Sequence, residues 1–242
     1  MVLRKVNSTA FAANKINGGY GSVQIIYDID LVVGKQEIVT IIGPNGCGKS
    51  TFLKVAFGLA TLYKGNIMYF DEDISGVRTD QLVNKGLSYV PQVNNIFPDL
   101  TILENLEMGG YRIKENISDD IERVFQIFPE LKERRFELAA NLSGGQRQML
   151  ALGRALMTRP KMMLLDEPTA ALSPIFVQEI LDKVTALRDD GMSILLVEQN
   201  AKSALRKSDY GYVFAHGELV YEDDADKILN NKNIGELFLG IA

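Results

Sequence analysis

Residues 43–50 read Gly43-Pro44-Asn45-Gly46-Cys47-Gly48-Lys49-Ser50, which matches G-x-x-x-x-G-K-[ST]. A strand-like run, 37–42 (EIVTII), precedes this stretch, and a helical pattern begins near Lys49. Glycines let backbone N–H groups surround an anion, and a helix N-terminus adds partial positive charge. The lysine suits β- and γ-phosphates, and the hydroxyl of Ser50 suits Mg²⁺. The sequence therefore predicts a nucleotide site, whose residues we expect to be Gly43, Pro44, Asn45, Gly46, Cys47, Gly48, Lys49, Ser50 and Thr51.

A pair of adjacent carboxylates follows the second strand-like run, 161–166 (KMMLLD). Asp166 ends that run, and Glu167 comes next. Ligands in open α/β sheets collect at the carboxyl ends of strands. We expect Asp166 to hold Mg²⁺, through water, and Glu167 to polarise the attacking water as general base. A polar strand end followed by a turn is the alternative, which the phosphate loop upstream disfavours.

A second glycine-rich stretch, Leu142-Ser143-Gly144-Gly145-Gln146, opens another helical pattern. Ser143 is a good N-cap residue, and the glycines leave backbone N–H groups accessible to an anion. One nucleotide hardly needs two such helix ends from one chain. We expect the nucleotide to lie between the phosphate loop of one protomer and this stretch of another, contacting Ser143, Gly144, Gly145 and Gln146. An ordinary capped helix is the alternative.

The remaining patterns predict an α/β fold of the P-loop NTPase type, with one domain in two lobes. A third strand-like run, 193–198 (SILLVE), completes the core of a buried, largely parallel sheet. Residues 2–33 are typical of an antiparallel β layer with turns at Asn17-Gly18-Gly19 and at Gly34. We place the core lobe at about 1–92 and 160–242, and an inserted all-helical subdomain at about 93–159. A final helix is expected to reach Leu239.

Composition narrows the function classes further. The chain has 242 residues, with 26 Lys and Arg against 31 Asp and Glu, so its formal net charge is −5. This acidic balance disfavours nucleic acid as the main partner, because phosphate backbones attract a basic face. The longest apolar runs fall far short of the roughly 18 residues that a membrane span needs, so we expect no direct membrane insertion. Cys47 is the single cysteine, which excludes an internal disulfide.

The ordered motifs resemble those of the ATP-binding-cassette (ABC) ATPase family over essentially the whole chain. The resemblance rests on the phosphate loop, Leu142–Gln146 and the stretch Leu164-Leu165-Asp166-Glu167-Pro168-Thr169. It implies ATP and Mg²⁺ as cofactors and ATP hydrolysis as the activity. It also implies that Tyr20 stacks on adenine, where an ordinary buried tyrosine is the alternative. Gln92 matches the loop glutamine that touches Mg²⁺ and the attacking water, where a solvent-facing glutamine is the alternative.

Within this family the chain is most similar to LivF-type subunits of branched-chain or hydrophobic amino-acid importers. The similar stretches are 43–51, 95–101, 196–200 and the end near Phe238-Leu239-Gly240. The resemblance implies integral membrane permease subunits and a second ATP-binding subunit, identical or related, as partners. It places the chain in the cytoplasm, at the inner face of the cell membrane. Alternatives are a soluble ABC ATPase of repair or translation, and a weakly active regulatory module.

Several positions depart from the family pattern, and others have two alternative roles. Gln199 stands where most members have a histidine that senses the γ-phosphate, so we expect it to contact phosphate without carrying charge. Ser173 stands where aspartate is commoner, and the sole histidine, His216, is expected in a surface turn. We expect Cys47, beside Lys49 and a helix N-terminus, to favour thiolate, or else to be a small filler. Ile96, Phe97 and Leu100 line either a groove for a partner helix or the core of the helical lobe.

Overall fold

Two sheets form the framework of the protein in the computed structural model, which describes residues 4, 6–93, 95–231 and 234. The four-stranded antiparallel sheet has the order β2-β1-β4-β5. Its strands are β1 (Thr9–Tyr20), β2 (Val23–Gly34), β4 (Thr61–Tyr69) and β5 (Glu72–Asp73). The six-stranded sheet has the order β10-β9-β3-β8-β7-β6. Its strands are β3 (Ile38–Ile42), β6 (Leu87–Val90), β7 (Met162–Asp166), β8 (Ser193–Val197), β9 (Tyr210–Ala215) and β10 (Glu218–Asp224).

The larger sheet is mixed, as the sequence predicts. Strands β9, β3, β8, β7 and β6 run parallel, and β10 pairs antiparallel with β9. Every residue of β3, β7 and β8 is buried, because these central strands are covered on both faces. The sequence predicts these three strands but not β6, a strand of four residues that is too short to give a clear pattern.

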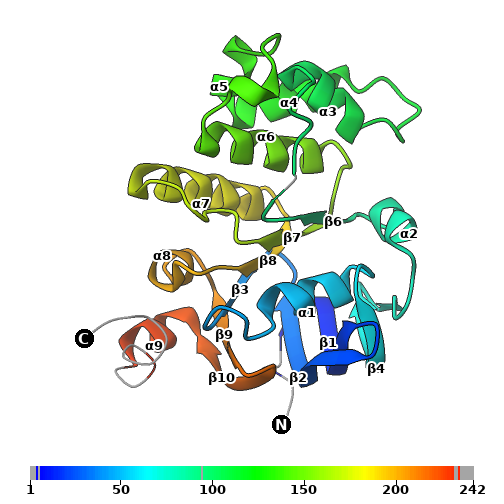
Figure 1. Cartoon of the computed structure of the whole chain (residues 1–242), viewed down its shortest axis with the longest axis vertical. Helices are drawn as coiled ribbons and strands as arrows, with labels where there is room; N and C mark the ends of the chain where they lie inside the picture. Colours follow the sequence, from blue (N-terminus) through cyan, green and yellow to red (C-terminus); the bar gives the residue numbers. More distant parts are fainter. Residues whose placement is uncertain (1–3, 5, 94, 232–233, 235–242) are drawn as a thin grey trace.

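Helices cover both faces of the larger sheet and extend from one end of it (Figure 1). On one face, α1 packs in a core cluster with the antiparallel strands, and its apolar residues Phe52, Leu53, Val55 and Ala56 are all buried. On the other face, α3 to α7 share a second cluster with alternate residues of β7 and β8. The helices are α1 (Lys49–Ala56), α2 (Thr79–Asn84), α3 (Ile102–Gly109), α4 (Ser118–Ile127), α5 (Pro129–Glu133), α6 (Gly144–Leu156), α7 (Pro174–Asp189), α8 (Ala201–Leu205) and α9 (Ala225–Asn230).

The segment that follows the Gln92 loop is helical. Between residues 93 and 159, leaving out residue 94, the regular elements are α3, α4, α5, a 3₁₀ turn at Ala139–Asn141 and α6. Figure 1 shows α3 to α6 gathered at one end of the molecule, with β1, β2 and β4 at the other end. None of the described helices is long and apolar enough to cross a membrane. The expected end of the last helix at Leu239 lies outside the described residues.

The predicted turn at Asn17-Gly18-Gly19 is wrong. These residues lie inside β1, and the hairpin turn falls at Gly21 and Ser22 instead. The glycines serve close packing: a Cβ on Gly18 would lie 2.6 Å from Val55 Cγ2, and one on Gly19 would lie 2.0 Å from the Val23 carbonyl oxygen. Shifts in the pairing register at both glycines fit this role, since glycine in a strand often marks a bulge or a close approach.

Candidate functional site

The phosphate loop joins the end of β3 to the start of α1. Gly43, Gly46 and Gly48 have φ of 149°, 77° and 104°, a region that side-chain-bearing residues rarely adopt. A Cβ on Gly43 would lie 2.1 Å from the Phe214 carbonyl oxygen, so β9 also requires glycine there. Gly48 caps α1 with no side-chain hydrogen bond. The N-cap residue therefore supplies no acceptor for the first-turn N–H groups of α1.

Lys49 is buried within this loop. Its ammonium group donates to the carbonyl oxygens of Gly43 at 2.9 Å and Pro44 at 3.1 Å. It also lies 4.0 Å from Glu167 Oε1. A buried ammonium group that donates to carbonyl oxygens can exchange them for phosphate oxygens.

Asp166 connects the loop to the neighbouring strand β7. Its Oδ1 accepts a hydrogen bond from the Ser50 hydroxyl at 2.7 Å. Its Oδ2 accepts one from the Tyr89 hydroxyl at 2.9 Å. The hydroxyl and carboxylate predicted as Mg²⁺ ligands therefore meet across 116 residues of sequence, and Tyr89 of β6 orients the carboxylate.

Both glutamines predicted at the site donate hydrogen bonds to the same oxygen of Glu167. Gln92 Nε2 donates to Glu167 Oε2 at 2.9 Å, and Gln199 Nε2 donates to the same atom at 2.8 Å. Gln92 is exposed, and its side chain also contacts Glu167. Glu167 itself has φ of 47°, a strained value for a residue with a side chain, of the kind that is concentrated at functional sites.

The environment of Glu167 favours its action as a general base. Burial raises the pKa of its carboxyl group; Lys49 opposes the rise, Asp166 adds to it, and the hydrogen bond from Gln199 opposes it. A carboxylate whose pKa is moved toward neutrality accepts a proton more readily than an ordinary glutamate. The residue can therefore polarise a water molecule held against it.

These residues line one cavity. Its volume is about 210 Å³, and its walls are Asn45, Gly46, Gly48, Lys49, Ser50, Thr51, Gln92, Glu167 and Gln199. Ligand pockets that enclose a drug-sized molecule occupy roughly 300–1,000 Å³, so this cavity holds only part of a nucleotide. The rest of a nucleotide bound here needs another surface.

The second glycine-rich stretch lies at the start of α6, on the helical segment, and its residues do not line this cavity. Ser143 is the N-cap, as expected: its Oγ accepts from the Gln146 N–H at 3.3 Å, and Gln146 Oε1 accepts from the Ser143 N–H at 3.1 Å. Ser143 and Gly144 are exposed, whereas Gly145 is buried because Phe176 packs against it. An exposed helix N-terminus is thus presented outward.

Tyr20 is 45% exposed at the end of β1, so it is not an ordinary buried tyrosine. A ring at that position is available for stacking. His216 is exposed in the turn between β9 and β10, as predicted, and Ser173 is the N-cap of α7 without a side-chain hydrogen bond.

The expectation that Cys47 favours thiolate is wrong. Its side chain is 5% exposed and belongs to the core cluster beneath the loop. Burial raises the pKa of the thiol, and the opposing effect of Lys49 is smaller. The apolar contacts outweigh the helix N-terminus, so Cys47 behaves as a small core residue.

Two further residues contact the site without a clear signal in the sequence. Tyr89 touches Asp166, and its signal is only its place three residues before Gln92. Glu198, directly after β8, is 1% exposed, and its Oε1 accepts from the Thr169 N–H at 2.9 Å. That bond ties the end of β8 to the chain just beyond Glu167. Burial raises the pKa of Glu198 to about 7, against the lowering effect of its hydrogen bonds.

The mixed sheet, the loop at β3 and the paired carboxylates at β7 define a P-loop nucleotide-binding protein. A sequence model of the ABC transporter family matches residues 26–170. The chain is 40% identical to the high-affinity branched-chain amino acid transport ATP-binding protein BraG of Pseudomonas aeruginosa, over 94% of this chain and 98% of the relative. It is also 40% identical to the probable branched-chain amino acid transport ATP-binding protein LivF of Archaeoglobus fulgidus, over 94% and 97%.

Solved structures agree. The ADP conformation of MJ1267, an ATP-binding cassette of an ABC transporter, superposes with a TM-score of 0.85 at 27% identity, covering 96% of this chain and 98% of that one. The chain therefore belongs to the ABC transporter family. It is an ABC ATPase, the kind of subunit that hydrolyses ATP to power transport.

Proposed function

We propose that the chain is the ATP-hydrolysing subunit of an importer for branched-chain or hydrophobic amino acids. One observation carries the hydrolytic part: Lys49, Gln92 and Gln199 all approach Glu167, beside the Ser50–Asp166 pair. The chain would act as one ABC domain, with a core lobe at about 1–92 and 160–242 and a helical subdomain at about 93–159.

Mg²⁺ fits the donors present. This ion takes oxygen ligands, keeps several waters, and binds through one or two carboxylates together with substrate phosphates. The Ser50 hydroxyl and the Asp166 carboxylate are such a set, and Gln92 adds an amide group at the same cavity. When bound, the ion would neutralise charge that develops on the phosphates.

In the proposed mechanism the loop amides and Lys49 bind the β- and γ-phosphates. Lys49 gives up its hydrogen bonds to Gly43 and Pro44 and donates to phosphate oxygens. Glu167 takes the proton of the attacking water, once an amide group has left its Oε2 to make room. Gln92 and Gln199 then orient the water and the γ-phosphate, and Tyr20 stacks on the base.

We propose that ATP lies between two protomers. The cavity at the phosphate loop is too small for the whole nucleotide, and the exposed N-terminus of α6 offers free backbone N–H groups and the Ser143 hydroxyl. Ser143, Gly144, Gly145 and Gln146 of a second ATP-binding subunit would complete the site.

Replacing Glu167 with glutamine tests the mechanism. The amide keeps the shape but cannot accept a proton, so we expect turnover to fall by roughly 10²–10⁴-fold while ATP binding persists. ATP hydrolysis and nucleotide affinity are measured in parallel. Unchanged turnover in Glu167→Gln, with wild-type affinity, would remove Glu167 from the catalytic role.

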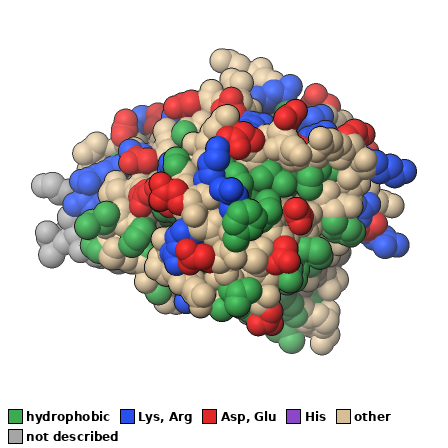
Figure 2. Space-filling model, turned by 90° about the horizontal axis from the view of Figure 1, so that it is seen from above, with side chains coloured by type: hydrophobic (Ala, Val, Ile, Leu, Met, Phe, Trp, Pro, Cys, Tyr) green, Lys and Arg blue, Asp and Glu red, His purple; other side chains and the backbone are tan. Residues whose placement is uncertain are grey.

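A groove beside Gln92 offers a place for an integral membrane permease subunit. A cavity of about 200 Å³ is lined by residues from both sides of the Gln92 loop, among them Tyr89, Pro91 and Arg154. Phe97 is 43% exposed and lies over the Arg154 guanidinium at 4.8 Å, whereas Ile96 packs against the helical core and Leu100 is half-buried. Figure 2, which views the helical end, shows apolar side chains gathered among charged ones.

We expect Phe97→Ala to lower amino-acid uptake by tenfold or more while sparing ATP hydrolysis by the isolated chain. Phe136→Ala is the matched control, because Phe136 is 70% exposed and lies under Arg135 on the same helical segment. Equal losses of uptake and hydrolysis in Phe97→Ala would contradict a docking role. Co-purification of the chain with integral membrane subunits tests its peripheral position at the inner face of the cell membrane.

The cargo is proposed from the likeness to BraG and LivF. Cells that lack the chain should lose uptake of labelled leucine, isoleucine and valine, and wild type should restore it where Glu167→Gln does not. Normal uptake of all three in the absence of the chain would overturn this cargo and leave the ATPase intact.

A further inference from the structure

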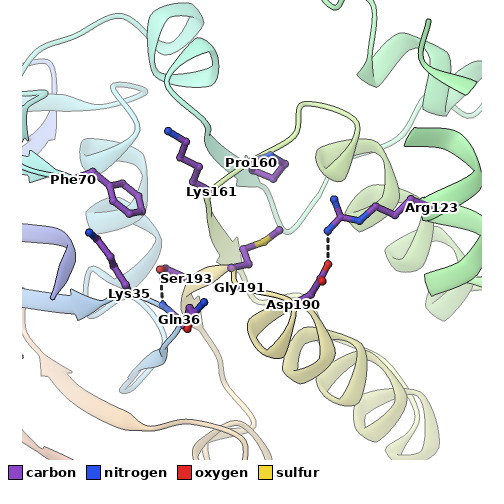
Figure 3. A pocket seen from close by; sticks show the side chains of 10 residues that line it. Lys35, Gln36, Phe70, Arg123, Pro160, Lys161, Asp190, Gly191 and Ser193 are labelled. Atoms are coloured by element: carbon purple, nitrogen blue, oxygen red, sulfur yellow. Dashed lines mark hydrogen bonds and ion pairs between the residues drawn. The ribbon is translucent and has the colours of Figure 1, made fainter. Parts of the chain in front are cut away.

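A second cavity lies at the opposite end of the parallel strands from the phosphate loop. Its volume is about 540 Å³. Residues just before β3, β7 and β8 line it, together with the β4–β5 turn, the end of α7 and α4. Figure 3 shows Phe70 and Lys35 on one side and Arg123 on the other, with Lys161 between them at the rim. The volume falls within the range of sites for small molecules.

The lining carries positive charge in a chain whose net charge is −5. Lys35, Arg123 and Lys161 are cationic, and among the described residues that line the cavity Asp190 is the only acid. Arg123 forms an ion pair with Asp190, which leaves the two lysines as the uncompensated charges (Figure 3). Across residues 6–93 and 95–231, neither lysine ammonium group forms an ion pair with a carboxylate. Both ammonium groups are therefore available to an anion that enters the cavity.

The walls also offer apolar surface and a rigid frame. Lys35 Nζ lies 5.4 Å from the centre of the half-buried Phe70 ring, and Pro160 and the buried Met192 also line the cavity. The Gln36 N–H donates to Ser193 Oγ at 3.0 Å, which fixes the Lys35–Gln36 turn to the start of β8. Gln36 and Phe70 are held at φ of 56° and 43°. The cavity therefore combines a turn fixed to β8, an aromatic ring and two exposed lysines.

We propose that this cavity binds a small organic phosphate. The phosphoryl group would lie between Lys35 and Lys161, and the organic part would cover Phe70, Pro160 and Met192. Lysine is a frequent phosphate ligand as a point charge, and apolar walls with a few placed polar groups are typical of small-molecule sites. Because Arg123 comes from the helical segment and the lysines come from the sheet side, an occupant would contact both parts of the molecule.

Affinity labelling of the full chain with pyridoxal 5′-phosphate tests this site. The aldehyde condenses with an amine to an imine, releasing water, and borohydride reduces the imine to a stable amine. Peptide mapping then gives the labelling rate of each lysine separately, so labelling at Lys49 does not interfere. We expect Lys35 and Lys161 to react at least tenfold faster than Lys64 and Lys202, which are exposed lysines outside the cavity.

Three controls make the result specific. Pyridoxal, which lacks the phosphate, should show no preference for the two lysines; an equal preference would mean reactive amines only and would overturn the proposal. Phenyl phosphate should slow labelling at both positions more strongly than equimolar inorganic phosphate, and equal protection would overturn the organic part.

Lys161→Gln should abolish the preference at Lys35, whereas Lys64→Gln should leave it unchanged. Uniform labelling of all exposed lysines would also overturn the proposal.

Discussion

The N-termini of α1 and α6 both lie in glycine-rich stretches, but only the N-terminus of α6 is capped by a side chain. At α1 the N-cap is Gly48, which supplies no side-chain acceptor. At α6 the Ser143–Gln146 capping box already satisfies part of the first turn. The difference indicates that α1 depends on a ligand for its first-turn polar groups, while α6 satisfies part of its own first turn with the Ser143–Gln146 capping box.

Among the substitutions that test this comparison, Lys49→Ala should have the largest effect on ATP turnover. Removing the ammonium group from the loop deletes a charge that would bind the β- and γ-phosphates, so we expect ATP turnover to fall by about 10²–10³-fold or more. Nucleotide binding to the isolated protomer should weaken with it. Titration with a fluorescent ATP analogue checks the affinity, and wild-type binding in Lys49→Ala would show that α1 does not need its lysine.

Ser143→Ala should separate the second helix end from the first. We expect turnover to fall by roughly tenfold, while ATP binding to one protomer stays unchanged, because Ser143 does not line the loop cavity. The lost cap should also lower the free energy of unfolding by about 1 kcal/mol.

Thr101→Ala is the matched control, because Thr101 forms a capping box with Glu104 at the start of α3. It should cost a similar free energy of unfolding and leave turnover unchanged. A loss of turnover equal to that of Ser143→Ala would mean that helix stability, and not contact with nucleotide, explains both variants.

Glu198 should make the free energy of unfolding depend on pH. Its pKa is raised to about 7 in the folded chain, so its contribution to stability is complete below its ordinary pKa and is lost as pH rises through about 7. Glu198→Gln should therefore flatten the fall in unfolding free energy between about pH 5 and pH 8, by a few kcal/mol at most. Denaturant unfolding at several pH values measures this, and an identical profile in the variant would exclude Glu198 as the cause.

Cys47 should give the smallest effect. Its buried thiol has a raised pKa, so iodoacetamide should label the folded chain slowly, with or without Mg-ATP. Cys47→Ala should cost about 1 kcal/mol of stability and keep most of the ATPase activity. Rapid labelling that Mg-ATP prevents would restore a nucleotide-linked thiol.

The sequence by itself determined the features that depend on nearest neighbours. The phosphate loop, the strand before it and the N-cap at Ser143 follow from backbone freedom and capping within a few residues. The family motifs also identified Glu167, Gln92 and Gln199 as candidates, but not how they meet.

Only the tertiary structure decided what meets at the strand ends. The order β3-β8-β7-β6 brings Glu198, Glu167 and Tyr89 to one edge, and it turns two glutamines toward one carboxylate oxygen. The same packing buried Cys47 in the core and made Gly18 and Gly19 contact points instead of a turn. These outcomes depend on pairing between residues far apart in sequence, so no local pattern could specify them.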